Sequence, residues 1–276
     1  MQLEIILAFL LILMTAFMFA PLGLGGGVLY VPIFLFVFEW DIHLALVCSL
    51  ILVWMVSLGS RVAHLKGGYA VISVGKKGIV AALGGAIVGA LLAALFINWM
   101  GDMSIKILAS FLLIWVIYST VKKLTNENNG SGNGEAQTPE VEGRILRMYR
   151  AGCFGGGAAS GLLGIGGGAI FMTLHRSALG FKQHQAAGTS YIIETWMVPM
   201  GILAHLLIDE SGRAVLETLG LYLVPICLIV AGTAWLGART AIKLLPQRVL
   251  TYPFIIAVVA SLIRYLIDIR ELLLIG

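Results

Sequence analysis

Two glycine-rich stretches decide how this chain folds: Leu22-Gly23-Leu24-Gly25-Gly26-Gly27 and Leu163-Gly164-Ile165-Gly166-Gly167-Gly168. A shift of 141 residues lays the first stretch over the second without a gap. The same shift pairs further identical residues, among them His43 with His184, Ser49 with Ser190 and His64 with His205. Identities at one constant offset indicate that the chain contains two copies of one repeat.

The chain around these stretches has the composition of a membrane protein. Of its 276 residues, 59% are hydrophobic and only 12% are charged, which is about half the charged fraction of a typical soluble domain. A helix needs about 20 apolar residues to cross a bilayer. Runs of about that length are Leu3–Ala20, Ala45–His64, Ile79–Ile97, Ile105–Val121, Ala186–Leu207, Val215–Leu236 and Val249–Ile267. The net charge of +4 comes from basic residues in short loops, which argues against a nucleic-acid partner.

One extended polar stretch, Lys122–Arg150, divides the chain near its middle. Its centre, from Asn126 to Glu142, is rich in Asn, Gly, Ser and Glu, the composition of a flexible linker. We therefore expect a first membrane repeat over residues 1–121, a hydrophilic linker over residues 122–148 and a second membrane repeat over residues 149–276.

The charges of corresponding loops indicate that the two repeats are inverted relative to each other. Lys and Arg concentrate in cytoplasmic loops. Residues 61–77 contain basic side chains and no acid, whereas the matching loop carries Asp209 and Glu210 against Arg213. In two further pairs of corresponding loops, one loop is acidic and its counterpart in the other half is basic. Because the polar linker cannot cross the bilayer, each repeat must cross it an odd number of times.

We expect an all-α polytopic membrane protein in which each repeat is a glycine-broken re-entrant hairpin followed by three transmembrane helices. The arms after the glycines are Val28–Phe38 and Ala169–Leu179, each about 16 Å long as helix and too short to span the bilayer. The breaks should therefore lie well inside the membrane, as in many secondary transporters. We place the protein in the bacterial inner membrane, with the linker in the cytoplasm and both termini in the periplasm.

The glycine triplets are also the candidate binding site. The arms that follow them would present helix N-termini, which carry unpaired N–H groups and a partial positive charge. Two such ends pointing at one midplane cavity would bind an anion without a buried Lys or Arg. The residues expected to line this site are Gly25, Gly26, Gly27, Val28, Gly166, Gly167, Gly168 and Ala169. The alternative is that the glycines only permit close packing of helices.

Hydroxyl groups follow each hairpin. Ser49, Thr189 and Ser190 lie just inside the next helix, where they could donate hydrogen bonds to an anion held between the breaks. The alternative is that they bond back to the carbonyl groups of their own helices, as membrane Ser and Thr often do.

Titratable residues near the same place are candidates for gating or proton coupling. His43 and His184 occupy equivalent positions, where an imidazole could bind an anion or relay a proton, or else anchor the helix at the interface. Glu194 lies inside a full-length apolar helix, and intramembrane acids are costly and by default functional. A structural hydrogen bond is the alternative role. Val53 takes the place of Glu194 in the first repeat, so any such role breaks the symmetry.

Neither a metal nor a cofactor is expected. Cys48, Cys153 and Cys227 are isolated along the chain, and no metal-binding motif is present. The nearest Ser–His pair, Ser190 with His184, has a spacing of six residues that does not favour a catalytic dyad. We therefore do not expect an enzyme.

The second glycine stretch belongs to a longer motif. Ser160–Gly168 (SGLLGIGGG), followed by Ala187–Ser190 (AGTS), resembles the signature of the TauE/SafE sulfite exporter family. Pro21–Gly27, with Val31 and Pro32, is the first-half counterpart. The resemblance covers essentially the whole chain, including the duplication and the central hydrophilic loop. It implies transport of sulfite, of sulfonates such as sulfoacetate, or of other sulfur-containing organic anions.

We therefore expect a secondary transporter, an exporter that binds small sulfur-containing anions at the midplane of the lipid bilayer. Export of an anion from an inside-negative cell is downhill by about 2.3 kcal/mol per charge per 100 mV, so it needs no coupled ion. The alternatives are a passive anion channel and an importer of another small organic anion.

Overall fold

The structure is a computed structural model, and it describes residues 2–129, 140–208, 214–244 and 247–275. The regular structure in these ranges is helical. Its elements are α1 (Gln2–Phe19), η1 (Ala20–Leu22), α2 (Gly27–Phe36), α3 (Ile42–Lys66), α4 (Ile72–Met100), α5 (Asp102–Asn129), α6 (Gly143–Leu163), α7 (Gly168–Leu179), α8 (Gln183–Ile208), α9 (Ala214–Leu219), η3 (Gly220–Tyr222), α10 (Leu223–Leu244) and α11 (Gln247–Ile275).

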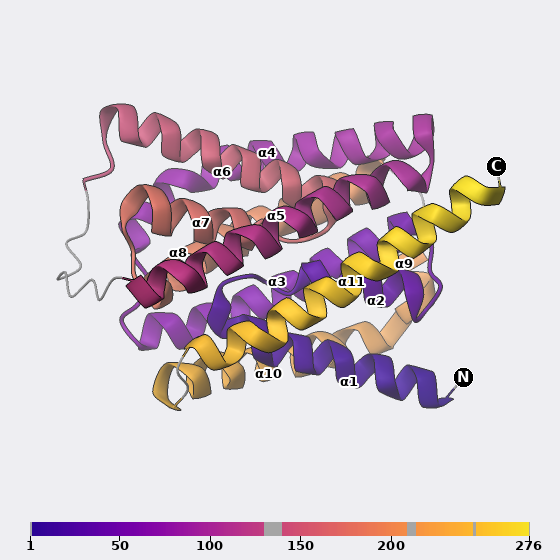
Figure 1. Ribbon diagram of the computed structural model, residues 1–276, viewed down its shortest axis with the longest axis horizontal. Coiled ribbons are helices and arrows are strands. Elements are labelled where there is room, and N and C mark those ends of the chain that lie inside the picture. The colour runs from indigo at the N-terminus through magenta and orange to yellow at the C-terminus, as the bar shows by residue number, and fades with distance from the viewer. Residues whose placement is uncertain (1, 130–139, 209–213, 245–246, 276) are drawn as a thin grey trace.

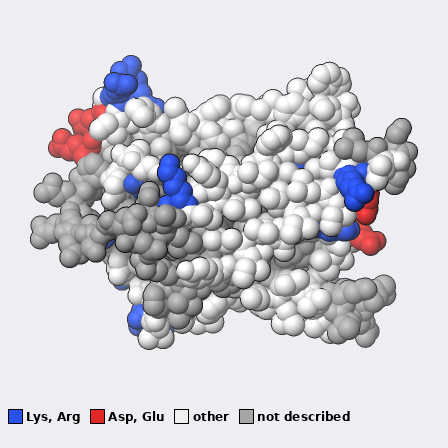
Figure 2. Space-filling model, viewed as in Figure 1, with Lys and Arg blue, Asp and Glu red and all other residues white. Residues whose placement is uncertain are grey.

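Helices long and apolar enough to cross a bilayer make this a multi-pass membrane protein. The described residues contain 5 such spans, which are α3, α4, the first part of α5, α8 and the segment Glu217–Leu244 that includes α10. Figure 2 shows the charged side chains of the visible face gathered toward the two ends of the long axis, with an uncharged band between them. An uncharged band of this kind matches the hydrocarbon core of a membrane.

Two shorter helices follow the glycine stretches, as the sequence predicts. The helix α2 has 10 residues and α7 has 12, so they are about 15 and 18 Å long and cannot span the bilayer alone. They begin one residue earlier than predicted, at Gly27 and Gly168. Helix α5 continues to Asn129 and α6 begins at Gly143, so helix extends into both ends of the predicted linker, whose centre lies outside the described residues.

The helices of the two halves pack against each other in matching pairs. Helix α4 packs on α6 and α8, and its counterpart α10 packs on α1 and α3, the counterparts of α6 and α8. Helices α3 and α8 also pack against each other at the buried centre. Figure 1 shows both chain termini at one end of the molecule, whereas α5 ends and α6 begins at the opposite end, called here the linker end. This arrangement supports the inverted repeat, which stays a prediction.

Small residues let α4 and α6 approach closely. The glycines at their contact recur every fourth residue on both helices: Gly85, Gly89, Gly157 and Gly161. A Cβ atom added to Gly85 would collide with the carbonyl oxygen of Phe154, and one added to Gly157 with that of Ala82. These glycines therefore have the packing role that the sequence analysis considered for the glycine triplets.

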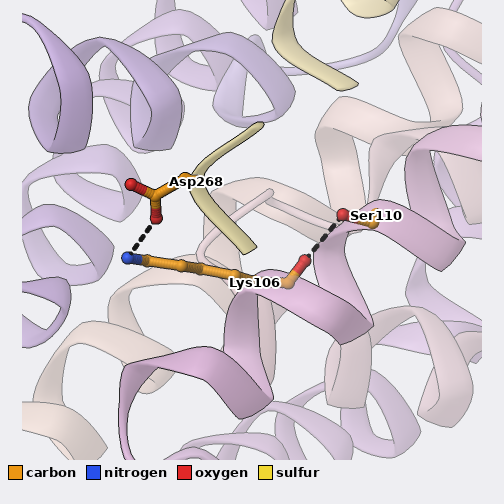
Figure 3. A network of polar contacts seen from close by, with 3 residues as sticks. All are labelled: Lys106, Ser110 and Asp268. Atoms are coloured by element: carbon orange, nitrogen blue, oxygen red, sulfur yellow. Dashed lines mark hydrogen bonds and ion pairs between the residues drawn. The ribbon is translucent and has the colours of Figure 1, made fainter. Parts of the chain in front are cut away.

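An ion pair joins the last helices of the two halves. Lys106 on α5 contacts the carboxylate of Asp268 on α11, and both side chains are partly buried. Figure 3 shows this contact beside the hydrogen bond that the Ser110 hydroxyl donates to the carbonyl oxygen of Lys106. The pair joins two helices at the periphery of the molecule.

Removal of one member of this pair should loosen the contact between α5 and α11. We expect Asp268→Ala to lower the free energy of unfolding by about 1 kcal/mol, since Lys106 then keeps its charge without a partner. Glu140→Ala, which removes an exposed acid outside the helices, is the control. Thermal unfolding of the detergent-purified protein measures both, and equal stability of the two variants would show that the pair contributes nothing.

Candidate functional site

The two glycine stretches adopt the same backbone conformation. Gly23, Gly25 and Gly26 have φ angles of 74°, 70° and 89°. Their counterparts at the 141-residue shift, Gly164, Gly166 and Gly167, have φ angles of 68°, 85° and 73°. Side chains rarely adopt these left-handed conformations, so glycine is required at all six positions. Each stretch ends one helix and starts the next, and we call these two stretches the glycine breaks.

The short helices that leave the breaks begin without a side-chain cap. Gly26 and Gly167 occupy the N-cap positions and have no side chain to offer. The first backbone N–H groups bonded within these helices are those of Leu29 and Ile170. In the described part of the chain, the backbone N–H groups before these, those of Gly27 and Val28 in α2 and of Gly168 and Ala169 in α7, have no hydrogen-bond acceptor. Each break thus presents free N–H donors at the positive end of a helix dipole.

The two breaks lie against each other. A Cβ atom built on Gly27 would be 2.5 Å from the Cα of Ile165 and 2.7 Å from the carbonyl oxygen of Gly164. A Cβ atom built on Gly168 would be 2.8 Å from the Cα of Leu24 and 2.6 Å from the carbonyl oxygen of Gly23. These contacts are reciprocal, because each break touches the same two positions of the other. Each half-helix N-terminus therefore lies against the backbone of the other break. That the two N-termini share one binding site stays a prediction.

The space beside this contact is small. A cavity of about 10 Å³ borders Gly27, Val28 and Ile165 and extends to α5 and α11. This volume is near the minimum that one water molecule requires. The breaks are therefore closed against each other in this structure, and an anion would enter only if they moved apart.

Glu194 on α8 projects into the contact between the breaks. Its side chain is fully buried. Oε2 lies 2.6 Å from the hydroxyl of Ser57 on α3, and Oε1 has no hydrogen-bond partner. Oε1 is also 2.7 Å from the place where a Cβ on Gly168 would sit. Val53 is the counterpart of Glu194 in the first half. Its side chain and the carboxyl group of Glu194 both lie beside Gly25.

The hydroxyl groups expected at the site already have partners within the protein. Ser49 donates a 2.7 Å hydrogen bond to the carbonyl oxygen of Gly164, so it ties α3 to the opposite break. Ser190 donates to its own helix at Ala186, at 2.8 Å, which is the alternative role considered above. Thr189 accepts a 3.1 Å bond from the amide of Val71, just before α4. Their role as substrate ligands stays a prediction.

The structure separates the two histidines at the equivalent positions. His43 lies in the first turn of α3 and His184 in the first turn of α8, and both are half-buried. The ring of His184 contacts Tyr69, with ring centroids 5.1 Å apart, and lies 6.3 Å from His64. His184 is therefore part of a cluster at the linker end.

A buried histidine that was not among the residues predicted from the sequence connects three helices. His175 on α7 lies 3.0 Å from the hydroxyl of Tyr149 on α6 and 3.1 Å from that of Ser190 on α8. Because Ser190 donates its proton to Ala186, the Nδ1–H of His175 must donate to Ser190 and Tyr149 must donate to Nε2. All three groups are thereby satisfied. The signal was weak, because His175 has no counterpart histidine at the 141-residue shift.

Further polar residues surround Glu194, and of these only His64 was singled out in the sequence, as the counterpart of His205. Ser57, Ser60 and His64 share one face of α3, at spacings of three and four residues, and all three are buried. Tyr191 precedes Glu194 by one turn of α8, and its hydroxyl donates a 3.1 Å bond to the carbonyl oxygen of Phe19. The helical spacing alone could have identified this group.

Comparison with known proteins identifies one family. The sequence model of a family described as "Sulfite exporter TauE/SafE" matches residues 8–265 of the chain. No curated protein and no solved structure matched the chain.

Proposed function

Because the chain belongs to the TauE/SafE sulfite exporter family, we propose that it carries small sulfur-containing anions across the bilayer and binds them between its two glycine breaks. The observation that carries this proposal is that each uncapped half-helix N-terminus packs against the backbone of the other break. Each contributes free N–H donors and a partial positive charge, and their fields add where they meet. An oxyanion offers several acceptor oxygens to such a site.

The amides that would contact the anion belong to Gly27 and Val28 of α2 and to Gly168 and Ala169 of α7. Backbone donors suit a site in the membrane, because they hold an anion without the cost of a buried Lys or Arg. Ser49 fixes the carbonyl oxygen of Gly164 at 2.7 Å. It therefore supplies a hydrogen bond to a carbonyl oxygen that lies beside the N-terminus of α2.

A carrier accounts for the closed breaks better than a passive channel. The backbones of the two halves touch at Gly27 and Gly168, and the cavity beside them has about 10 Å³. An anion therefore crosses only if the halves move relative to each other, which is how inverted repeats alternate access around a fixed site. A channel would need a continuous water-filled path through the same contact.

The basic residues indicate which end faces the cytoplasm. Lys77 at the start of α4 donates a 3.0 Å hydrogen bond to the carbonyl oxygen of Val141, just before α6. Lys66, Arg239 and Lys243 line a cavity of about 320 Å³ at the ends of α3 and α10. By the positive-inside rule this linker end is cytoplasmic. Export from that side of a bacterial inner membrane is downhill for an anion.

A ligand panel tests the proposal. Sulfite, sulfate, thiosulfate, sulfoacetate, taurine and chloride would each be added to the purified protein, and thermal stability would be measured. A ligand of the folded state stabilises it by about 2.7 kcal/mol at 100 times its Kd. We expect a selective increase with a sulfur oxyanion or sulfonate, and no increase with any of them would overturn the proposal.

The variant Ala169→Pro locates the site. Proline lacks the N–H group but is tolerated in the first turn of a helix. We expect anion affinity to fall about 10-fold or more, since one hydrogen bond to a charged group contributes about 1.5–3 kcal/mol. Ala169→Ser keeps the amide and is the control. Equal affinities of the two variants would place the anion elsewhere.

A further inference from the structure

Several buried polar atoms lack a hydrogen-bond partner, and most of them belong to two helices. In the described part of the chain these atoms are Tyr30 Oη, Ser60 Oγ, His64 Nε2, Ser160 Oγ, His184 Nδ1 and Glu194 Oε1. Unsatisfied buried groups are rare in native proteins and call for a functional explanation. Ser60, His64, His184 and Glu194 belong to α3 and α8, the two helices that cross at the centre.

The position of Ser57 suits both protonation states of Glu194. The Ser57 hydroxyl lies 2.8 Å from the carbonyl oxygen of Val53 and 2.6 Å from Oε2 of Glu194. A hydroxyl has one proton, and a carbonyl oxygen can only accept. Ser57 therefore donates to Oε2 when Glu194 is ionised, and it donates to Val53 and accepts from the carboxyl group when Glu194 is protonated.

His64 is set up to pass a proton toward this carboxyl group. Its Nδ1 lies 2.9 Å from the carbonyl oxygen of Ser60, so Nδ1 carries the hydrogen and Nε2 has a free lone pair. Nε2 is buried and has no partner. The ring lies 6.3 Å from that of His184 and 5.7 Å from that of Tyr191. His184 is half-buried in the first turn of α8, so it can exchange protons with water at the linker end.

From His64 to Glu194 the polar groups follow one face of α3. His64, Ser60 and Ser57 are successively four and three residues apart, about 6 and 4.5 Å along the axis, and Ser57 contacts Glu194 directly. Such steps are longer than one hydrogen bond, so a proton passes along them only with a bridging water or a side-chain movement at each step. We call His184, His64, Ser60 and Ser57 the polar row.

The polar groups around Glu194 are not repeated at the matching positions. The counterparts of Ser57, Ser60, Tyr191 and Glu194 at the 141-residue shift are Val198, Gly201, Leu50 and Val53. His64 does have a counterpart histidine, His205, but its Nε2 is bonded to the carbonyl oxygen of Gly161 at 2.7 Å. This polar connection between the breaks and the linker end is therefore not matched by the 141-residue symmetry.

The other titratable groups on the elements around α8 do not compete for this role. Tyr30 and Tyr191 are buried close to the breaks, and His175 is fully bonded to Tyr149 and Ser190. Cys153 of α6 is a buried thiol packed against Gly78. The basic residues of the surrounding helices stand near helix ends: Arg61, Lys66, Lys76, Lys77, Arg144, Arg147, Arg150 and Arg176. Glu194 is thus the acid that faces the breaks.

We propose that Glu194 is the proton-binding group of the anion site, that it is protonated from the linker end through the polar row, and that an anion binds only with this proton in place. The inference rests on the proposed function. Oε1 of Glu194 lies beside the α7 N-terminus, where the anion would bind, and a carboxylate there would repel it. Protonation removes the negative charge, so each bound anion takes up one proton from the linker-end water.

Calorimetry of sulfite binding in buffers of different ionisation enthalpy measures this proton uptake. We expect the wild type to take up about one proton more per sulfite than Glu194→Gln does. Sulfite affinity should fall with rising pH in both proteins. For each pH unit, the affinity of the wild type should fall by about a further factor of ten compared with that of the variant. The protonation of sulfite itself cancels, because both proteins bind the same anion. Glu217→Gln removes an exposed acid and should behave as the wild type.

The outcomes of these measurements distinguish a failure of the inference about Glu194 from a failure of the proposed anion transport. Sulfite binding with equal proton uptake in the wild type and Glu194→Gln overturns the inference and leaves the proposed function standing. An absence of binding by sulfite and by every other anion of the panel overturns both. If Glu194→Gln does not fold, infrared difference spectra of the wild type decide. The C=O band of a protonated carboxyl should grow when sulfite binds at neutral pH, and an unchanged band overturns the inference.

A kinetic measurement tests the polar row. With a pH-sensitive dye in stopped flow, His64→Phe should slow sulfite-linked proton uptake at least tenfold without changing the number of protons taken up. His205→Phe, the substitution at the counterpart position, should leave the rate unchanged. Equal rates for the two variants would overturn the route through His64.

Discussion

Gly168→Ala is expected to destabilise the protein by about 3 kcal/mol, because a methyl group at this position has no space in the contact between the breaks. Its carbon would lie 2.6 Å from the carbonyl oxygen of Gly23, 2.7 Å from Oε1 of Glu194 and 2.8 Å from the Cα of Leu24. Two of these neighbours are backbone atoms and cannot rotate away. The halves can accept the methyl group only by separating where the anion is proposed to bind.

Gly155→Ala is the matched control for this change. Gly155 lies on α6, and a Cβ atom there would meet nothing within 4 Å. Thermal unfolding in detergent should show a large decrease for Gly168→Ala and little change for Gly155→Ala. Equal unfolding temperatures would mean that the two breaks do not touch, and that the N-termini of α2 and α7 do not share a site.

The second large effect is expected where α4 meets α6. Gly85→Ala places a methyl group against the carbonyl oxygen of Phe154 and should lower the free energy of unfolding by about 3 kcal/mol. Gly84 is the adjacent residue on the same helix, and its added Cβ would meet only the Phe154 ring, at 3.9 Å. Gly84→Ala should therefore be neutral or stabilise the helix by about 0.5–1 kcal/mol.

These two variants differ by one position and in nothing else, so chemical denaturation of the pair isolates the packing effect. Transport, measured in vesicles, should fall with Gly85→Ala only as far as the folded fraction falls. A loss of transport in a variant of wild-type stability would indicate that the α4–α6 contact moves during transport.

Local sequence signals predicted the elements of the fold well. The glycine stretches located both breaks, because six left-handed residues at matching positions can only be glycine. The apolar runs located the long helices, since a bilayer imposes their length. The ends of α5 and α6 were less predictable. A polar composition shows that a segment leaves the membrane, but helix can continue beyond the bilayer, as α5 does to Asn129.

The candidate site was only partly predictable. Glu194 was identified because an acid in an apolar helix is conspicuous. Its neighbour Ser57 was not, because the contact between them joins residues far apart in the chain. The hydroxyl of Ser49 was expected near the breaks, and its bond to Gly164 in the other half follows from tertiary packing. Pairing across the halves, rather than any local pattern, determines which groups remain without a partner.

The contact between the breaks also has a consequence for biogenesis. The N-terminus of α2 at Gly27 is covered by Gly164 and Ile165, which the ribosome makes about 140 residues later. At about 5–20 residues per second this delay is on the order of ten seconds. During it the first half resides in the bilayer with an open break, so a chaperone or insertase must hold it. Truncated chains that end before α6 should therefore be degraded rather than accumulate as a stable half-protein.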